Sequence, residues 1–264
     1  MNFDRFKKVV VRDFNSTYQL YGMSMLIMMC VPVAVWLFGL AFKIPEIGTI
    51  GRQGILQFIV VLAAAISSMK IYKSCNLPGK GNYFAMLPAS LGEKFCSMMI
   101  YCFIVTPLAV FVGLFVVDTL LTLLPFGPFK DYIWHTPAWL QEIGDVALWY
   151  DNGRFSFDAN MSTLLKAITA SSIFMFANTI FKKNKFIKTV LWIMLISFVL
   201  SIVVVPIISH IHWDFEWLAD LFGKFIDSPE KLHSFVFWGT TLFNLLVTAI
   251  FSWLTYRRLK KMQY

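Results

Sequence analysis

Few residues in this chain have the types and spacing that catalysis or metal binding requires. Of its four histidines, His210 and His212 are separated by a single residue. That spacing could chelate a metal from an extended segment, but it does not place the two rings side by side on a helix. The sequence has no HExxH, GxSxG or GxxxxGK[ST] motif, and Gly79-Lys80-Gly81 lacks the spacing of a phosphate loop. We therefore expect no catalytic centre, no metal site and no cofactor bound by this chain.

The cysteines argue in the same direction. The sequence has four of them, without a CxxC pair: Cys30, Cys75, Cys96 and Cys102. None falls in the segments that are expected outside the membrane, so a disulfide framework and a thiolate metal site are both disfavoured. We expect all four to be small buried hydrophobic residues.

The most distinctive short pattern lies between Asn82 and Tyr101, where a polar turn meets a long apolar run. Pro88 disfavours a helical conformation in the residue before it. Ser90, followed by Glu93, is a capping-box pair, in which each side chain satisfies the backbone amide of the other residue. The pattern predicts a stiff corner that ends at Ser90 and a helix that starts there and enters the membrane. A partner protein could push on such a corner, but a helix start without a partner fits these residues equally well.

The composition predicts an all-α polytopic membrane protein. The 264 residues are 58% hydrophobic and only 14% charged, far from the average of a soluble domain. Crossing a bilayer takes roughly 20 apolar residues in a helix. Six stretches meet this length, approximately Leu20–Phe42, Gly54–Ile71, Cys96–Leu124, Thr163–Phe181, Ile187–Ile208 and Phe235–Tyr256. The first is too long for a signal peptide and lacks a cleavage site, so we expect it to be retained.

The basic residues predict the orientation. Four alternate segments each carry four Lys or Arg: Arg5, Lys7, Lys8 and Arg12; Lys70, Lys73, Lys80 and Lys94; Lys182, Lys183, Lys185 and Lys188; and Arg257, Arg258, Lys260 and Lys261. The other three connections hold most of the acidic residues. The positive-inside rule therefore places both termini in the cytoplasm. Because topology accounts for the net charge of +8, no nucleic-acid partner is expected.

Two features refine this topology. In residues 1–19, Phe3, Phe6, Val10 and Phe14 recur at helical spacing, which predicts an amphipathic helix on the cytoplasmic surface; an ordinary basic lead-in is the alternative. From Ser90 to Leu124 the third span would be about 52 Å long as one helix, beyond the roughly 30 Å hydrocarbon core. It must tilt, kink or project, and Pro107 supplies a kink. Asp118 then falls near the outer interface, where a structural role is the main expectation.

Two outer segments, 125–162 and 209–234, contain amphipathic aromatic stripes such as Trp139–Tyr150 and Trp213–Phe225. These predict helices at the outer membrane interface, which either anchor the chain or cover a substrate exit. The spans contain small polar residues, which usually join helices to one another: Ser67, Ser68, Thr169, Ser171, Ser172, Asn178 and Asn244. No ionisable residue is expected at mid-depth, so neither an intramembrane hydrolase nor a proton-coupled carrier is supported.

Taken together, these features resemble the membrane subunit, or permease, of type-2 ABC transporters, the exporter-type class. Members have six spans, both termini inside, an amphipathic helix before the first span, and short outer helices between the fifth and sixth. Between the second and third spans, which corresponds to segment 72–95 of this chain, they have a cytoplasmic coupling helix with a sequence like Leu-Pro-x-Ser-x-x-Glu. The matching residues here are Leu87, Pro88, Ser90, Glu93 and Lys94. The ending Tyr256-Arg257-Arg258-Leu259-Lys260-Lys261 is also similar to the family. The long segment 125–162 departs from its simplest members.

The resemblance implies a chain that is not an enzyme and that works with a separate ATPase subunit, which binds the ATP. It implies a second permease copy or a paralogue, contacts with membrane lipids, and a bacterial cytoplasmic (inner) membrane. Leu87, Pro88, Ser90, Glu93 and Lys94 would form the partner-coupling site. In it, Pro88 and Ser90 shape the corner, while Glu93 and Lys94 offer charge to the ATPase.

Two other interpretations remain open at this point. A non-transporting membrane scaffold, or an assembly factor for an envelope complex, predicts the same topology without an ATPase partner. A stand-alone carrier would need a polar pathway through the membrane. The substrate, and the choice between a homodimer and a heterodimer, do not follow from the sequence.

Overall fold

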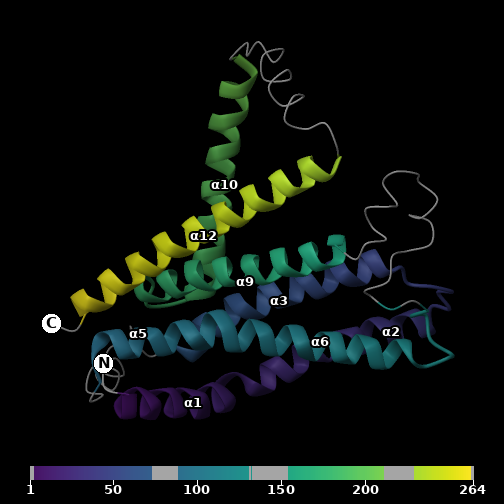
Figure 1. The fold of residues 1–264 in the computed structure, drawn as a ribbon, viewed down its shortest axis with the longest axis horizontal. Helices are drawn as coiled ribbons and strands as arrows, with labels where there is room; N and C mark the ends of the chain where they lie inside the picture. Colours follow the sequence, from purple (N-terminus) through teal and green to yellow (C-terminus); the bar gives the residue numbers. More distant parts are fainter. Residues whose placement is uncertain (1–2, 73–88, 131, 133–153, 211–228, 263–264) are drawn as a thin grey trace.

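A computed structural model describes residues 3–72, 89–130, 132, 154–210 and 229–262. Throughout this described part the regular structure is helical and no strand occurs. The helices are α1 (Phe3–Met29), α2 (Val31–Ala41), α3 (Thr49–Ile71), α5 (Leu91–Met99), the π-helix η2 (Ile100–Val105), α6 (Thr106–Thr122), α9 (Arg154–Ile180), α10 (Lys185–His210) and α12 (Pro229–Met262). Figure 1 shows their arrangement.

Six helical segments are long and apolar enough to cross a membrane, which confirms the predicted all-α polytopic fold. They are Tyr21–Ala41, Gly51–Ile71, Leu91–Thr122, Met161–Ile180, Lys185–Val203 and Ser234–Lys261. The helix of the fourth span, α9, starts at Arg154 and so begins inside the predicted outer segment 125–162. The aromatic stripes Trp139–Tyr150 and Trp213–Phe225 lie outside the described residues.

The N-terminal segment differs from the expected separate helix. Residues 3–19 are helical, but α1 continues without interruption into the first span and ends only at Met29. The first span is instead interrupted near Cys30, and α2 follows with Pro32 in its first turn. Proline has no amide hydrogen and clashes with the preceding turn, which accounts for a break here. On α1, Phe3 and Phe14 are exposed while Asp13 is buried.

The third span is continuous from α5 through η2 to α6. Its π-helical turn ends directly before Thr106 and Pro107, the position where the sequence predicts a kink. Single π-helical turns inside α-helices shift the hydrogen-bond register by one residue. The long predicted span is therefore one element with a register change near its middle.

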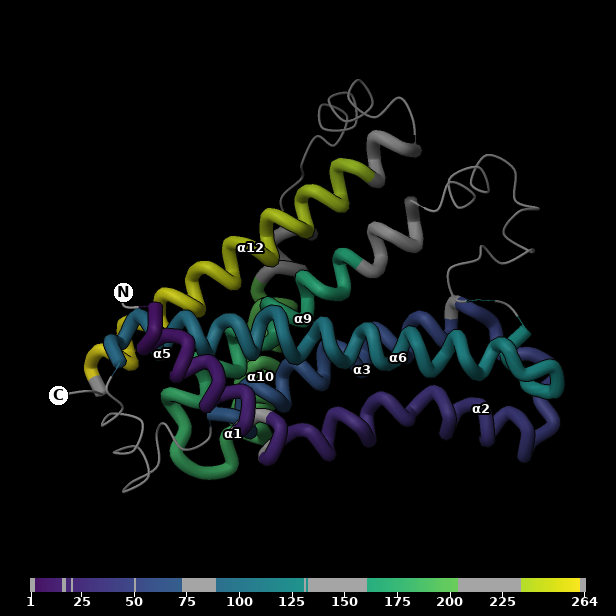
Figure 2. The backbone as a smooth tube through the Cα atoms, turned by 60° about the horizontal axis from the view of Figure 1, so that its bottom comes forward, coloured from purple at the N-terminus to yellow at the C-terminus, as the bar shows by residue number. Residues whose placement is uncertain are grey.

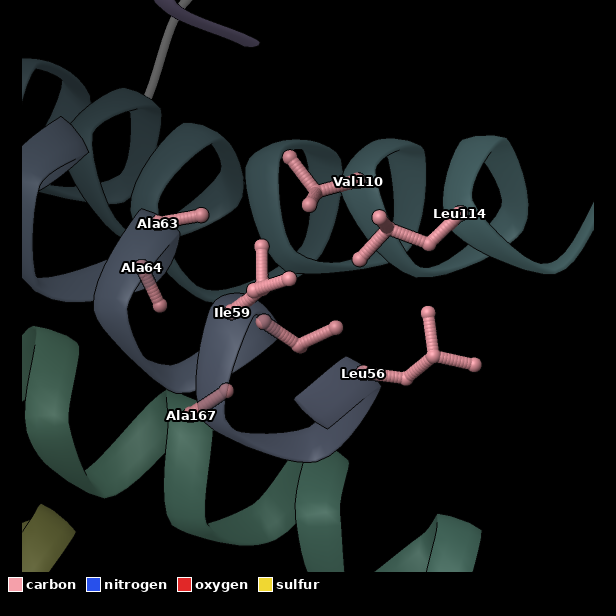
Figure 3. Packing of buried hydrophobic residues seen from close by; sticks show 8 residues of the cluster. Leu56, Ile59, Ala63, Ala64, Val110, Leu114 and Ala167 are labelled. Atoms are coloured by element: carbon pink, nitrogen blue, oxygen red, sulfur yellow. The ribbon is translucent and has the colours of Figure 1, made fainter. Parts of the chain in front are cut away.

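The core is built from small side chains where α3, α6 and α9 meet. Ala63 and Ala64 of α3 and Ala167 of α9 are fully buried, and small residues let helix backbones approach closely. Figure 3 shows these alanines beside Val110 and Leu114 of α6. Leu56, Ile59 and Val60 complete this cluster on α3.

Polar side chains join the helices, as the sequence predicts for several of them. Asn178 Nδ2 of α9 donates to the Ser68 carbonyl of α3 at 3.1 Å. Thr169 Oγ1 of α9 donates to Asn244 Oδ1 of α12 at 3.1 Å. The hydroxyls of Ser67 and Ser172 instead bond within their own helices.

In contrast to α3, α10 is almost entirely exposed from Phe186 to Val203, where its side chains are described. In Figure 1 it diverges from the bundle, and only 6% of the residues in the apolar stretch of its span are buried. Its exposed residues are apolar on every face, as the consecutive residues Trp192, Ile193, Met194 and Leu195 show. A helix that is apolar all round needs an apolar environment, and a bilayer supplies one.

Both views show which helix ends lie together. The start of α1, the start of α5, the α9–α10 connection and the end of α12 lie toward one end of the molecule (Figures 1 and 2). We call this the basic end, because the four segments rich in Lys and Arg adjoin it. The ends of α2 and α6 and the start of α3 lie at the opposite end (Figure 2).

Candidate functional site: a capped corner at the basic end

The capping box at the start of α5 is formed as the sequence predicts. The Glu93 amide donates to Ser90 Oγ at 3.3 Å, and the Ser90 amide donates to Glu93 Oε2 at 2.9 Å. Ser90 is extended, with φ −67° and ψ 155°, so the chain turns sharply into the helix at this residue. Two amides that a helix start leaves without an intrahelical acceptor are therefore satisfied inside the corner.

The two charged residues of the corner do not face outward. The exposed fractions of Glu93 and Lys94 are 3% and 2%. This differs from the expectation that both side chains offer their charge to a partner. The physical reason for Glu93 is the cap itself, because its carboxylate turns back onto the Ser90 amide. Among the described residues, the surface of the corner consists instead of Ser90, which is exposed, and of half-buried Ala89, Leu91 and Gly92. An ideal Cβ at Gly92 would meet no atom within 4 Å.

Leu87 and Pro88, which complete the predicted partner-coupling site, lie outside the described residues. Three of the five candidate residues, Ser90, Glu93 and Lys94, are thus brought together on the first turn of α5. Their role in coupling to a partner stays a prediction.

Asp13 ties the corner to the N-terminal helix, a connection that sequence reasoning missed. Its Oδ2 accepts from Ser97 Oγ of α5 at 2.7 Å and from the Tyr72 hydroxyl, at the end of α3, at 3.2 Å. Arg12 forms an ion pair with the same carboxylate. A buried carboxylate needs such partners, because an unpaired charge away from water is costly. The signal in the sequence is an acid within a basic, otherwise amphipathic segment.

Two further contacts fix the corner on either side. The Tyr101 hydroxyl of η2 donates to the Val10 carbonyl of α1 at 2.8 Å. Phe95 of α5 meets Tyr256 of α12 edge to face, with ring centroids 5.4 Å apart. The start of the third span is therefore attached to both terminal helices, and a displacement of α5 would act on all of them.

The π-helix leaves one backbone carbonyl without a donor from its own helix. The Thr106 amide donates to the Tyr101 carbonyl, five residues back. The Cys102 carbonyl thus loses the Thr106 amide, and the next residue, Pro107, has no amide hydrogen. Ser171 Oγ of α9 donates to this carbonyl at 2.9 Å. A side chain of the fourth span therefore holds the register change of the third.

Asp118 is paired in the structure, near the end of α6. It forms an ion pair with Arg52 of α3, with Nη2–Oδ2 at 2.6 Å and Nε–Oδ1 at 3.2 Å. The Arg52 guanidinium also lies 4.1 Å from the centre of the Phe129 ring. Both charged side chains are buried. This bidentate geometry matches the structural role expected for Asp118.

The described residues contain no group of three or more His, Cys, Asp or Glu that could hold a metal ion. Of the two candidate ligands, His210 ends α10, whereas His212 lies outside the described residues. The corner presents a rigid surface that is connected to several spans, so a force on this surface would be passed on to them.

Comparisons with protein-family models, with curated proteins and with solved structures found no match to this chain.

Proposed function

We propose that this chain is the permease subunit of a type-2 ABC exporter. In this proposal a separate ATPase subunit docks at the corner that starts at Ser90, and the chain itself binds no ATP. The observation that carries the proposal is the capped corner, which is at once presented at the basic end and fixed to both terminal helices, α1 and α12.

The corner has the properties that a coupling element needs. The capping box makes the turn stiff, so a push on Ala89 to Gly92 moves the helix rather than bending the turn. Through Ser97 and Asp13 the same movement reaches α1, and through Phe95 it reaches α12. A partner whose position depends on bound nucleotide could thus bias the spans between two arrangements.

The remaining parts of the proposal follow from the resemblance. Two permease subunits, either two copies or this chain and a paralogue, would enclose the substrate path. The basic end would lie in the cytoplasm of a bacterial cell, in agreement with the positive-inside rule. The burial of Glu93 and Lys94 changes one detail: the docking surface would be formed by the exposed and half-buried residues from Ala89 to Gly92 rather than by these two charges.

Affinity purification of the tagged chain from its native membrane, in mild detergent and with mass spectrometry, tests the proposal. We expect an ATPase subunit to co-purify in an amount comparable to the chain itself. A chain that is recovered without an ATPase, under conditions that keep other membrane complexes intact, would favour the scaffold interpretation instead.

A further inference from the structure

A basic cavity lies where α9 turns into α10, apart from the corner. Its volume is about 490 Å³, and the described residues that line it include no carboxylate. Four lysines line it, Lys70, Lys182, Lys183 and Lys185. The described lining also contains apolar side chains, namely Met69, Phe186 and Ile187.

The lysines fall into two groups. Lys185 is buried and fixed, because its Nζ donates to the Asn178 carbonyl at 3.2 Å, and Lys70 donates to Ser24 Oγ at 2.6 Å. Lys182 and Lys183 are exposed on the short turn between the helices. Holding several cations around one cavity is costly without an anion, because like charges repel one another. The cavity therefore has two positioned lysines and two that can close on an anionic group.

The start of α10 adds to the positive potential. Phe186 and Ile187 line the cavity and belong to the first turn of this 26-residue helix. The N-terminus of a helix carries a partial positive charge and presents backbone amides, which favours phosphate groups. Asn184, with a φ of 51°, makes the sharp turn that brings this helix start beside Lys182 and Lys183.

The apolar surface beside the cavity favours a lipid over a dissolved anion. The cavity adjoins α10, whose next turns expose Leu191 and Trp192 to the membrane. An anion that carries acyl chains could place its headgroup among the lysines and lay its chains along this apolar helix. Basic pockets between spans at the cytoplasmic surface recognise anionic headgroups in this way.

We infer that this cavity binds the phosphodiester headgroup of an anionic glycerophospholipid. The proposed orientation enters only in assigning the lipid to a leaflet, which would be the cytoplasmic one. It does not depend on an ATPase partner, so it can fail or hold independently of the proposed function.

Native mass spectrometry of the full-length chain in detergent, with added lipid, tests the inference. We expect phosphatidylglycerol to bind and phosphatidylcholine with the same acyl chains not to. The double variant Lys182→Gln/Lys183→Gln should bind phosphatidylglycerol roughly 25-fold more weakly, at about fivefold per lysine. The matched control is Lys260→Gln/Lys261→Gln, which removes two exposed lysines at the end of α12 and should bind as the unchanged chain does.

Three outcomes would overturn the inference. Equal binding of phosphatidylcholine would show that the headgroup charge is not recognised. Equal losses in the two double variants would show a general attraction to the basic end instead of a site. Displacement of the lipid by inorganic phosphate would assign the cavity to a dissolved phosphate group.

Discussion

Each buried carboxylate discussed above has a partner that accounts for its position. Asp13 accepts from Ser97 and Tyr72, and Asp118 is bidentate with Arg52. Within a membrane protein an ionisable group that faces the interior is costly unless it is paired in this way. The two carboxylates lie at opposite ends of the bundle, one beside α5 and one near the end of α6. At the residue scale, these contacts lock each end of the third span to its neighbours.

The capping box should respond differently to three substitutions. Ser90→Ala removes one cap and should cost about 1 kcal/mol. Glu93→Ala removes the other, whereas Glu93→Gln keeps an acceptor for the Ser90 amide. Hydrogen exchange of peptides that cover the start of α5 should therefore be about fivefold faster in the two alanine variants and nearly unchanged in the glutamine variant.

Thr240→Ala is the control for this prediction. It removes a hydroxyl that bonds only within α12, so exchange at the start of α5 should stay as it is. If Glu93→Gln were as fast as Glu93→Ala, the negative charge rather than the cap would hold the corner.

The Arg52–Asp118 pair should show strong coupling in a double-mutant cycle. Asp118→Leu or Arg52→Met alone leaves a buried charge without its partner, which costs about 3–5 kcal/mol. The double variant removes both charges and should recover most of that loss. Thermal unfolding in detergent measures this. A double variant that is destabilised by the sum of the two single losses would mean that the two residues are not energetically coupled.

At the scale of elements, the third span depends on the fourth. The register change in η2 leaves the Cys102 carbonyl to the Ser171 hydroxyl, while Ser171 also lies within 3.1 Å of the Ala64 carbonyl of α3. Three spans thus meet at one serine. A π-helical turn held from outside is a place where the register could change when the corner moves.

Ser171→Ala should destabilise the chain by about 1–3 kcal/mol, because it leaves a buried carbonyl without a donor. Pro107→Ala restores a backbone amide at position 107, which can donate to the Cys102 carbonyl in the π register. If the helix returns to the α register instead, the Thr106 amide can donate to it. The loss caused by Ser171→Ala should therefore be much smaller in the Pro107→Ala background. Unfolding temperatures of the four chains test this, and equal losses in both backgrounds would contradict the assignment.

How far the elements follow from the sequence can be judged from these cases. The spans, the capping box and a disturbance near Pro107 were predictable, because hydrophobic length, cap chemistry and proline act over a few residues. The partners of Asp13 and Asp118 were not, since Ser97 and Arg52 lie far away along the chain and only packing brings them close. The burial of Glu93 follows from the predicted cap. The burial of Lys94 does not follow from the sequence, because periodicity alone does not show what covers the first turn of α5.

At the scale of the whole molecule, the helix ends that adjoin basic segments share one end of the bundle (Figure 2). This arrangement agrees with an even number of spans. It also agrees with the positive-inside prediction, because the basic segments adjoin the same end of the bundle. The exposed apolar faces of α10 and α12 leave a large surface for lipid or for a second permease subunit.

Reporter fusions test the orientation directly. Green fluorescent protein after Tyr264 should fluoresce, because it folds in the cytoplasm. Alkaline phosphatase inserted after Lys130, in an exposed part of the segment that follows α6, should be active, because it needs the outer compartment. A dark first fusion with an inactive second one would invert the topology and place the capped corner outside.

The contact between the corner and an ATPase can be measured by photo-crosslinking in intact membranes. A photoreactive phenylalanine analogue at Gly92 has open space around its Cβ, and the same holds at Gly51, which serves as the control on α3 at the opposite end of the bundle. We predict an ATPase adduct from Gly92 and none from Gly51. No ATPase adduct from Gly92, in membranes where the chain is intact, would contradict the proposal that this corner couples the chain to an ATPase.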